Sequence, residues 1–188
     1  HLAAQALVRK SYEETLDTWE VNVLGTLNLL ESLKNIDYRC AAVMVTTDKV
    51  YRNQSWLYGY REIDPLGGHD PYSASKAAME IAIDSWRSSF CGNELGQNPF
   101  LAIATARAGN VVGGGDWAKD RIFPDAIKAL INKKTILVRN KHATRPWQHV
   151  LDPLNGYLLL AEALYKNILN VGGTNIDFAK PYNFGPKL

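Results

Sequence analysis

Apolar side chains recur at helical spacing in two long stretches of the chain. In residues 13–34 they follow one another at intervals of three and four, which predicts one long amphipathic helix. These positions are Leu16, Trp19, Val23, Leu27 and Leu30. A second stripe, in residues 71–90, consists of Met79, Ile83, Trp86 and Phe90. Asp70 and Pro71 are typical of a helix N-cap and a first helical position, so we expect this helix to begin at Pro71.

Two short apolar runs alternate with these helices. Residues 40–45 and 100–106 have the length of strands, and the first run is rich in small and β-branched residues. The alternation of helices and strands is typical of a parallel sheet with right-handed crossovers, so the predicted fold class is α/β. In an open sheet of this kind, ligands bind beyond the carboxyl ends of the strands. We therefore expect a site just after Val45 and Ala106, beside the long loop of residues 50–70.

The second half of the chain has a less regular pattern. Three consecutive glycines, residues 113–115, mark a candidate boundary between the sheet domain and a smaller region. Beyond them the pattern predicts a short helix at 124–133, a strand at 135–139 and a helix at 153–165.

Composition and charge exclude several classes of protein. The 188 residues are 46% hydrophobic and 21% charged, which is typical of a globular chain and not of a disordered one. The formal net charge is +2 and no run of Lys or Arg exceeds two residues, so we expect no nucleic-acid partner. The apolar stretches are far shorter than the ~20 residues of a membrane span. The cysteines and histidines have no disulfide or metal-ligand spacing, so we expect reduced thiols, a cytoplasmic location and no metal site.

The two ends of the chain do not look like natural termini. His1 opens the sequence with neither an initiator Met nor the features of a signal peptide, and the last residues stop in mid-pattern. We therefore expect these residues to be the interior of a longer protein.

Two groups of polar residues carry the candidate chemistry. Tyr72 and Lys76 are four residues apart, which places them on one face of the predicted helix. A neighbouring ammonium favours the phenolate, so such a pair can take a proton from an alcohol, although the same spacing also fits an unrelated surface pair. The stretch Thr46-Thr47-Asp48-Lys49 follows the first strand and presents a hydroxyl, a carboxylate and an ammonium at the sheet edge. By itself this stretch also fits a simple turn cap.

Together with other motifs, these residues resemble a known family. The combination is similar to the extended short-chain dehydrogenases/reductases that act on nucleotide sugars, and it covers nearly the whole chain. The motifs that carry it are His1-Leu2-Ala3-Ala4-Gln5, Asn22 with Gly25-Thr26, Thr46 to Tyr51, Tyr72-Ser-Ala-Ser-Lys76 and Arg107-Ala-Gly-Asn110. Four further stretches resemble the CDP-glucose 4,6-dehydratases in particular: Gly59 to Glu62, Asp64 to Gly68, Gly113 to Trp117 and Thr144 to His149.

The resemblance implies an NAD-binding Rossmann-type fold, with part of a smaller α/β substrate domain. Residues 1–112 would form the second half of the dinucleotide-binding domain, a doubly wound parallel sheet. Residues 113–188 would form mainly an incomplete substrate-binding region, with segments that can return to the first domain. The family's glycine-rich turn, Gly-x-x-Gly-x-x-Gly, which holds the cofactor pyrophosphate, is not among these residues. A polypeptide of these residues alone is therefore expected to bind NAD weakly and to be inactive.

Catalytic roles also follow from the resemblance. Tyr72 matches the base that takes the proton of the sugar 4-hydroxyl, and Thr47 matches a hydroxyl that shares the hydrogen bond at O4. Lys76 matches the residue that holds the nicotinamide ribose and lowers the pKa of the tyrosine. Asp48 matches the acid that protonates the departing 6-hydroxyl. The implied reaction is oxidation at C4 by NAD⁺, loss of water across C5 and C6, and return of the hydride to C6.

Lys49 stands where many related dehydratases have a glutamate that removes the C5 proton. The CDP-glucose 4,6-dehydratases resemble this chain in having a lysine there. Because a lysine accepts a proton only when it is neutral, two interpretations remain: direct proton transfer, which we favour, and an electrostatic role.

The same resemblance assigns further residues to the cofactor or the substrate. The expected NAD contacts beyond Tyr72 and Lys76 are Ala3, Ala4, Gln5, Thr46 and Ala108. The expected substrate contacts are Asn110, Arg121, Arg139, Arg145 and Asn183, of which Arg145 fits a diphosphate-binding arginine. A surface role fits Arg121 and Arg139 equally well, and strand packing fits Ala3 and Ala4. Asn22 is interpreted as a structural residue inside the first helix.

The sequence therefore predicts an NAD-dependent hydro-lyase that dehydrates CDP-glucose to CDP-4-keto-6-deoxyglucose. The alternatives are a dehydratase for another nucleotide sugar, an epimerase, and a truncated, non-catalytic relative that binds nucleotide sugars. The apolar stripes of the two long helices resemble the pair that builds a four-helix dimer interface in this superfamily. We therefore expect a homodimer or a higher homo-oligomer, with no membrane partner.

Overall fold

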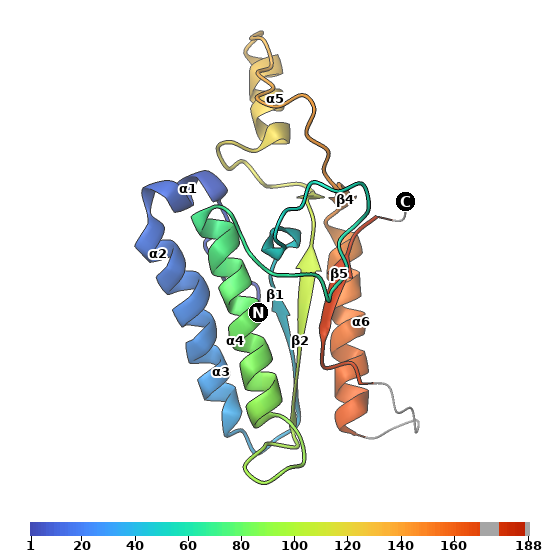
Figure 1. The fold of residues 1–188 in the computed structure, drawn as a ribbon. Helices are drawn as coiled ribbons and strands as arrows, with labels where there is room; N and C mark the ends of the chain where they lie inside the picture. Colours follow the sequence, from blue (N-terminus) through green and yellow to red (C-terminus); the bar gives the residue numbers. More distant parts are fainter. Residues whose placement is uncertain (170–176, 187–188) are drawn as a thin grey trace.

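A parallel sheet forms the centre of the protein (Figure 1). The computed structural model describes residues 1–169 and 177–186. The strand order is β1 (Cys40–Val45), β2 (Leu101–Ala108) and β5 (Pro181–Phe184). In register, Cys40 lies opposite Leu101, and Thr105 lies opposite Pro181. The two predicted strands and the α/β class are confirmed.

Helices cover both faces of this sheet. α3 (Gly25–Lys34) and α4 (Pro71–Phe90) pack on one face, and α6 (Leu151–Ile168) packs on the other (Figure 1). Because side chains alternate across a strand, Ile103 joins the core beneath α4 while Ala104 joins the core beneath α6. The sheet is therefore doubly wound. None of the helices in the described ranges is long and apolar enough to cross a membrane.

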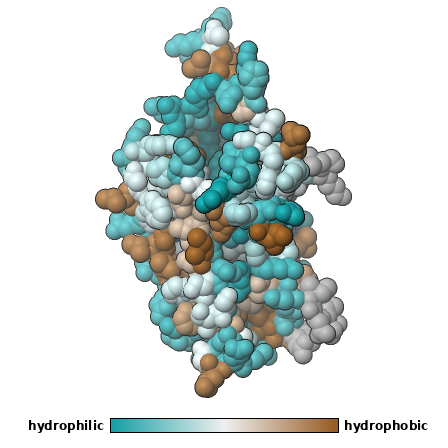
Figure 2. Space-filling view, in the orientation of Figure 1, coloured by the Kyte–Doolittle hydropathy of each residue, from teal (hydrophilic) through white to brown (hydrophobic). Residues whose placement is uncertain are grey.

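The helix expected at residues 13–34 is present, and its apolar stripe is divided between the core, which Leu30 enters, and the surface. It follows α1 (Val8–Glu13) and consists of α2 (Thr15–Trp19), the π-helical turn η1 (Glu20–Leu24) and α3. Leu16 is 84% exposed, and the residues with no exposed surface are Thr18, Asn22, Thr26 and Leu30. The polar members of this set find hydrogen-bond partners inside the molecule, so small polar side chains occupy the contact with α4. Apolar side chains remain on the outer flank of α2 to α4, where Figure 2 shows brown patches.

The second half of the chain contributes both to the sheet and to a separate small region. β3 (Val111–Val112) pairs in parallel with β4 (Gln148–His149), and α5 (Ile122–Ile131) stands away from the main sheet (Figure 1).

The prediction of a strand at residues 135–139 was wrong. This segment has no strand partner, Leu137 is 85% exposed, and Arg139 is held by Asp120 instead. Because a strand forms only where its backbone groups find a partner, β-branched composition was insufficient here. The domain division after residue 112 stays a prediction.

Gly68 lies just before α4 and packs against its first turn. A Cβ at Gly68 would overlap with backbone atoms of Ser73 and Ala74, whereas a Cβ at Gly59 would meet no atom within 4 Å. We expect Gly68→Ala to lower the free energy of unfolding by about 1–3 kcal/mol through overpacking. Gly59→Ala should change it by less than about 0.5 kcal/mol. Urea unfolding measures both, and equal stabilities would show that the segment before α4 shifts without cost.

Candidate active site

The residues after β1 turn sharply at the carboxyl edge of the sheet. The Thr46 amide donates to the Ala106 carbonyl (2.8 Å), which extends the pairing with β2 by one residue. Thr47 is extended and serves as the N-cap of the short 3-10 turn η2 (Asp48–Val50). Its hydroxyl oxygen accepts from the Lys49 amide (3.4 Å). This turn places Asp48 and Lys49 beyond the strand end, as the sequence predicts.

α4 begins where the sequence predicts, and its first turn is held by two side chains. Asp70 is the N-cap, and its carboxylate accepts from the Ser73 amide (3.0 Å) and from the Ser73 hydroxyl (2.6 Å). The Ser11 hydroxyl oxygen accepts from the Tyr72 amide (3.1 Å), and this contact is buried. The backbone of Tyr72 is therefore fixed by a residue far away in the sequence, which sequence reasoning missed.

The Tyr72 side chain is buried beside Thr47. Burial raises the pKa of the Tyr72 phenol, and the hydrogen bond with the Thr47 side chain opposes this shift. Smaller effects on the pKa of Tyr72 come from nearby charges, with Asp48 and Asp70 raising it and Arg121 lowering it. The phenol thus meets the hydroxyl that the family resemblance assigns to the same sugar oxygen.

Lys76 is buried one helical turn after Tyr72. Its ammonium donates to the Val45 carbonyl (3.3 Å) at the end of β1. Burial lowers the pKa of Lys76 to about 8, and the negative charge of Glu80 opposes this shift. A lysine ammonium has three donors, and among residues 1–169 and 177–186 one of them is used, so the others suit ligand oxygens such as ribose hydroxyls.

Asp48 and Lys49 form an ion pair with each other. The Lys49 ammonium lies 3.2 Å from Oδ1 of Asp48, and the Thr47 hydroxyl donates to the same oxygen (3.1 Å). Both side chains are about one-third exposed. The pair uses the ammonium form of Lys49, so Lys49 has to give up a proton before it can take one up.

The residues expected to contact NAD occupy different environments. Ala3 is exposed and Ala4 half-buried, beside the end of β1, where the His1 carbonyl accepts from the Val45 amide (3.0 Å). Thr46 and Ala108 are buried at the ends of β1 and β2. Small residues at this edge, together with the free donors of Lys76, fit a dinucleotide that lies across the strand ends.

Gln5 is the exception among these residues. Its amide nitrogen donates to the Thr18 hydroxyl (2.8 Å), and its amide oxygen accepts from the Leu7 backbone (2.6 Å). Its backbone N–H and C=O are both bonded to Asn22. The structure therefore gives the Gln5 side chain internal hydrogen bonds, while its cofactor contact stays a prediction. Asn22 makes structural contacts, in line with its interpretation.

The expected substrate residues are spread around the edge. Asn110 follows β2, and its buried Oδ1 has no hydrogen-bond partner among the described residues, which suits a ligand donor. Arg121 lies close enough to Tyr72 for its charge to act there. Arg145 is exposed, and its guanidinium donates to the Thr144 carbonyl (2.6 Å). Asn183 lies within β5, where the Tyr51 phenol donates to its Oδ1 (2.6 Å).

Arg139 does not join the others at the sheet edge. Together with Arg9 it pairs with the carboxylate of Asp120, at 2.6 Å and 2.9 Å. The two arginine side chains are exposed, at 64% for Arg9 and 51% for Arg139, and Asp120 is half-buried between them. The present contacts of Arg139 therefore correspond to the surface role that the sequence left open.

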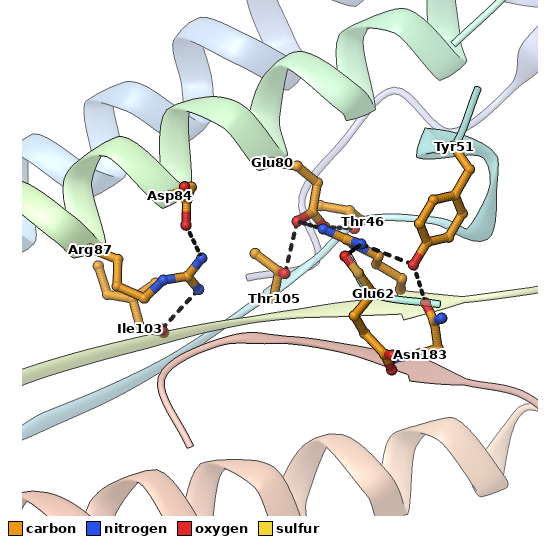
Figure 3. A network of polar contacts seen from close by, with 10 residues as sticks. Thr46, Tyr51, Glu62, Glu80, Asp84, Arg87, Ile103, Thr105 and Asn183 are labelled. Atoms are coloured by element: carbon orange, nitrogen blue, oxygen red, sulfur yellow. Dashed lines mark hydrogen bonds and ion pairs between the residues drawn. The ribbon is translucent and has the colours of Figure 1, made fainter. Parts of the chain in front are cut away.

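Glu80 and Arg107 form a buried ion pair that the sequence analysis did not single out (Figure 3). Oε2 of Glu80 accepts from Arg107 (2.8 Å) and from the Thr105 hydroxyl (2.9 Å). The sequence signals for this pair are that Glu80 lies one turn after Lys76 and that Arg107 is the one charged residue in a largely apolar strand.

The lowered pKa of Lys76 makes stability depend on pH. The folded chain releases this proton near pH 8 and the unfolded chain near pH 10.5, so the wild type gains stability as the pH rises between these values. We expect Lys76→Met to be more stable than the wild type at about pH 7, by up to about 3 kcal/mol, with the difference shrinking towards about pH 10. Denaturant unfolding measures the difference, and exposed Lys141→Met is the control. A constant difference would contradict the assignment.

The chain is similar in sequence to known nucleotide-sugar dehydratases. The chain is 44% identical to CDP-glucose 4,6-dehydratase of Salmonella typhimurium, covering all of this chain and 50% of that protein. It is 30% identical to dTDP-D-glucose 4,6-dehydratase of Dictyostelium discoideum, covering 96% of this chain and 43% of that protein. The chain therefore spans about half the length of these curated relatives.

Solved structures and a family pattern agree on the fold. The dTDP-glucose 4,6-dehydratase DesIV of Streptomyces venezuelae, solved with NAD and TYD bound, superposes with a TM-score of 0.76 at 24% identity, covering all of this chain and 51% of that one. UDP-N-acetylglucosamine 4-epimerase of Methanobrevibacter ruminantium M1 gives a TM-score of 0.75 at 21% identity, covering 98% of this chain and 53% of that one. The sequence pattern of the NAD dependent epimerase/dehydratase family matches residues 1–172. With a buried tyrosine and lysine at the carboxyl edge of a doubly wound sheet, the chain belongs to the NAD dependent epimerase/dehydratase family, whose cofactor is NAD.

Proposed function

We propose that the protein is an NAD-dependent nucleotide-sugar 4,6-dehydratase and that its substrate is CDP-glucose. The observation that carries this proposal is the contact of Tyr72 with Thr47, directly beside the Asp48–Lys49 pair. A tyrosine that accepts a proton as its phenolate and a carboxyl group that donates one as its acid form thus lie at one strand end. An epimerase at C4 needs the first group but has no need for an acid at O6.

The first half of the proposed reaction is assigned to Tyr72 and Thr47. The tyrosine takes the proton of the 4-hydroxyl, and the Thr47 hydroxyl shares the hydrogen bond at O4. Because burial raises the pKa of Tyr72, its deprotonation depends on positive charge at the site. Arg121 lowers the pKa of Tyr72 in the structure, and Lys76 is the cation that the family resemblance assigns to the same task. Bound NAD⁺ supplies the hydride acceptor that oxidation at C4 needs and, once reduced, the hydride that C6 receives.

The second half is assigned to Asp48 and Lys49. Transfer of a proton from the Lys49 ammonium to the Asp48 carboxylate, within their ion pair, gives the neutral amine and the carboxylic acid that this half needs. With a ketone at C4, the C5 proton becomes acidic, and neutral Lys49 takes it. Asp48 gives a proton to O6 as the C6–O bond breaks, so the oxygen leaves as water. The C5 proton returns when C6 receives its hydride, and the net change is loss of one water molecule.

CDP-glucose is proposed as the substrate on two grounds. The relative at 44% identity carries the name CDP-glucose 4,6-dehydratase, and Lys49 occupies the position where that subfamily is expected to have lysine. The remaining expected substrate contacts, Asn110, Arg121, Arg145 and Asn183, are part of this proposal. So is a homodimer formed through the exposed apolar flank of α2 to α4.

Incubation of the complete gene product with CDP-glucose and NAD⁺ tests the proposal. We expect a 4-keto-6-deoxy sugar nucleotide, identified by a mass lower by one water. Tyr72→Phe removes the proton acceptor and should lower kcat by a factor of about 10² or more, while nucleotide-sugar binding persists. Turnover of another sugar nucleotide alone would contradict the substrate, a product that retains its 6-hydroxyl would indicate an epimerase, and binding without turnover would indicate a non-catalytic relative.

Two substitutions of Lys49 separate proton transfer from an electrostatic role. Arginine keeps the positive charge opposite Asp48 but does not give up its proton, and methionine removes the charge. If Lys49 is the C5 base, both Lys49→Arg and Lys49→Met should slow the exchange of the C5 proton with deuterated solvent. The rate of this exchange should fall by a factor of about 10² or more. Exchange retained in Lys49→Arg and lost in Lys49→Met would establish the electrostatic role.

A further inference from the structure

The ion pair between Glu80 and Arg107 is withdrawn from solvent at the same sheet edge. The two side chains are 2% and 4% exposed, and Nη2 of Arg107 lies 2.8 Å from Oε2 of Glu80. A buried pair of this kind adds little stability over apolar residues of similar volume, because both charges lose their hydration. Its other contacts, more than its energy, therefore indicate what it does.

Those contacts reach both ends of one short segment, residues 46–51. At the first end, the Thr46 hydroxyl donates to Oε1 of Glu80 (2.5 Å). At the second end, Nη1 of Arg107 donates to the Tyr51 phenol oxygen (2.9 Å) (Figure 3). Thr47, Asp48 and Lys49 lie between these two points. A single ion pair thus holds the start and the finish of the turn that carries the proposed chemistry.

The middle of this segment has few anchors of its own. Backbone bonds fix Thr46 to Ala106 (2.8 Å) and Val50 to Gly67 (2.8 Å). Between them, the hydrogen bonds of Thr47, Asp48 and Lys49 are made within the turn, apart from the contact of Thr47 with Tyr72. The placement of Asp48 and Lys49 therefore depends on where the two ends of the turn are held.

Tyr51 is itself fixed on several sides, so the contact with Arg107 has a defined geometry. Its ring stacks on Tyr60, with centroids 5.0 Å apart and planes 8° apart, and the Arg107 guanidinium lies 5.1 Å from its centroid. Its hydroxyl donates to Asn183 of β5 (2.6 Å). Arg107 also donates to the Glu62 carbonyl (2.9 Å), which ties the loop before α4 to the same guanidinium.

From this arrangement we infer that Glu80 and Arg107 are positioning residues, which act through Thr46 and Tyr51 to set the place of Asp48 and Lys49. This inference rests on the proposed function for the roles of those two side chains. Tyr72 and Lys76 are positioned differently, since α4 has its own caps at Asp70 and Ser11. Thr47, which serves the oxidation step, has its own contact with Tyr72, whereas Asp48 and Lys49 bond only within the turn among the described residues. Loosening the pair therefore affects elimination of water more than oxidation at C4.

Tyr51→Phe is the variant that isolates this connection. It keeps the ring that stacks on Tyr60 and removes only the hydroxyl that joins Arg107 to Asn183. The matched control is Tyr60→Phe, in which the neighbouring ring loses a hydroxyl bonded to Asn53 and to the Gln54 amide instead. Arg107→Lys is a second probe, because a lysine lacks the fork that reaches Glu80 and Tyr51 together.

Kinetics of the complete gene product, on the nucleotide sugar that the wild type turns over, give the first test. We expect Tyr51→Phe to lower kcat about tenfold with KM changed less than about twofold. Absorbance of reduced nicotinamide should rise during turnover, because the step after oxidation becomes slower. Tyr60→Phe should have the kcat, the KM and the nicotinamide absorbance of the wild type. An equal slowing of every step with a lower Tm, or no change in Tyr51→Phe, would overturn the inference.

Hydrogen exchange of the backbone amides gives a second test that does not depend on the substrate. In Tyr51→Phe the amides of residues 47–50 should exchange faster, while those of α4 and all amides of Tyr60→Phe keep the wild-type rate. Unchanged exchange in residues 47–50 would refute the positioning role even if CDP-glucose proves to be the substrate. Conversely, faster exchange there supports it even if the proposed reaction fails. If Arg107→Lys does not fold, the exchange rates of Tyr51→Phe alone support or refute the positioning role.

Discussion

The structure depends on one constraint in α4: its buried face is polar at one end, and each polar group there needs a partner. Tyr72, Lys76 and Glu80 follow one another at intervals of four, so they line up along the side of the helix that faces the sheet. Their partners are Thr47, the Val45 carbonyl and Arg107. All three lie where β1 and β2 end, since strand ends offer unpaired carbonyls and side chains that leave the sheet. On the same helix, Met79 and Ile83 face apolar partners instead.

Charge within this row is balanced between neighbours on the same helix. Burial works against the ammonium of Lys76, and Glu80, one turn away, works in its favour. Glu80 in turn needs Arg107, because a lone carboxylate at this depth would lose its hydration without compensation. The cationic lysine of the proposed NAD site and the ion pair beneath the Thr46–Tyr51 turn thus belong to one electrostatic unit. Functional sites commonly contain groups that are unfavourable for stability, and neighbouring residues compensate for them.

Sequence patterns predicted the elements whose formation depends on neighbours in the chain. The Asp70–Pro71 start of α4 and the apolar strands needed only local signals, and the resemblance placed Tyr72, Thr47 and Asp48 together. Long-range partners were beyond this reasoning. Spacing gave no sign that Thr18 and Asn22 would be buried while Leu16 is exposed, because the choice of face depends on what packs opposite. The segment at 135–139 had strand composition without a partner strand. The hydrogen bond between Gln5 and Thr18 forms only when the folded chain brings the two residues together.

Asn22, in the π-helical turn, pairs with the backbone of Gln5 through its side chain, as a residue of a neighbouring strand would through its main chain. Its Oδ1 accepts from the Gln5 amide (2.8 Å) while its Nδ2 donates to the Gln5 carbonyl (3.1 Å) and to Ser75 on α4 (2.9 Å). One amide group thus copies the pairing of a peptide unit and couples the segment of Ala3 and Ala4 to the helix of Tyr72. Aspartate has two acceptors and no donor, and leucine of similar volume has neither. The position therefore requires a short side chain with both a donor and an acceptor, although it lies in a helix interior, where composition alone would favour an apolar residue.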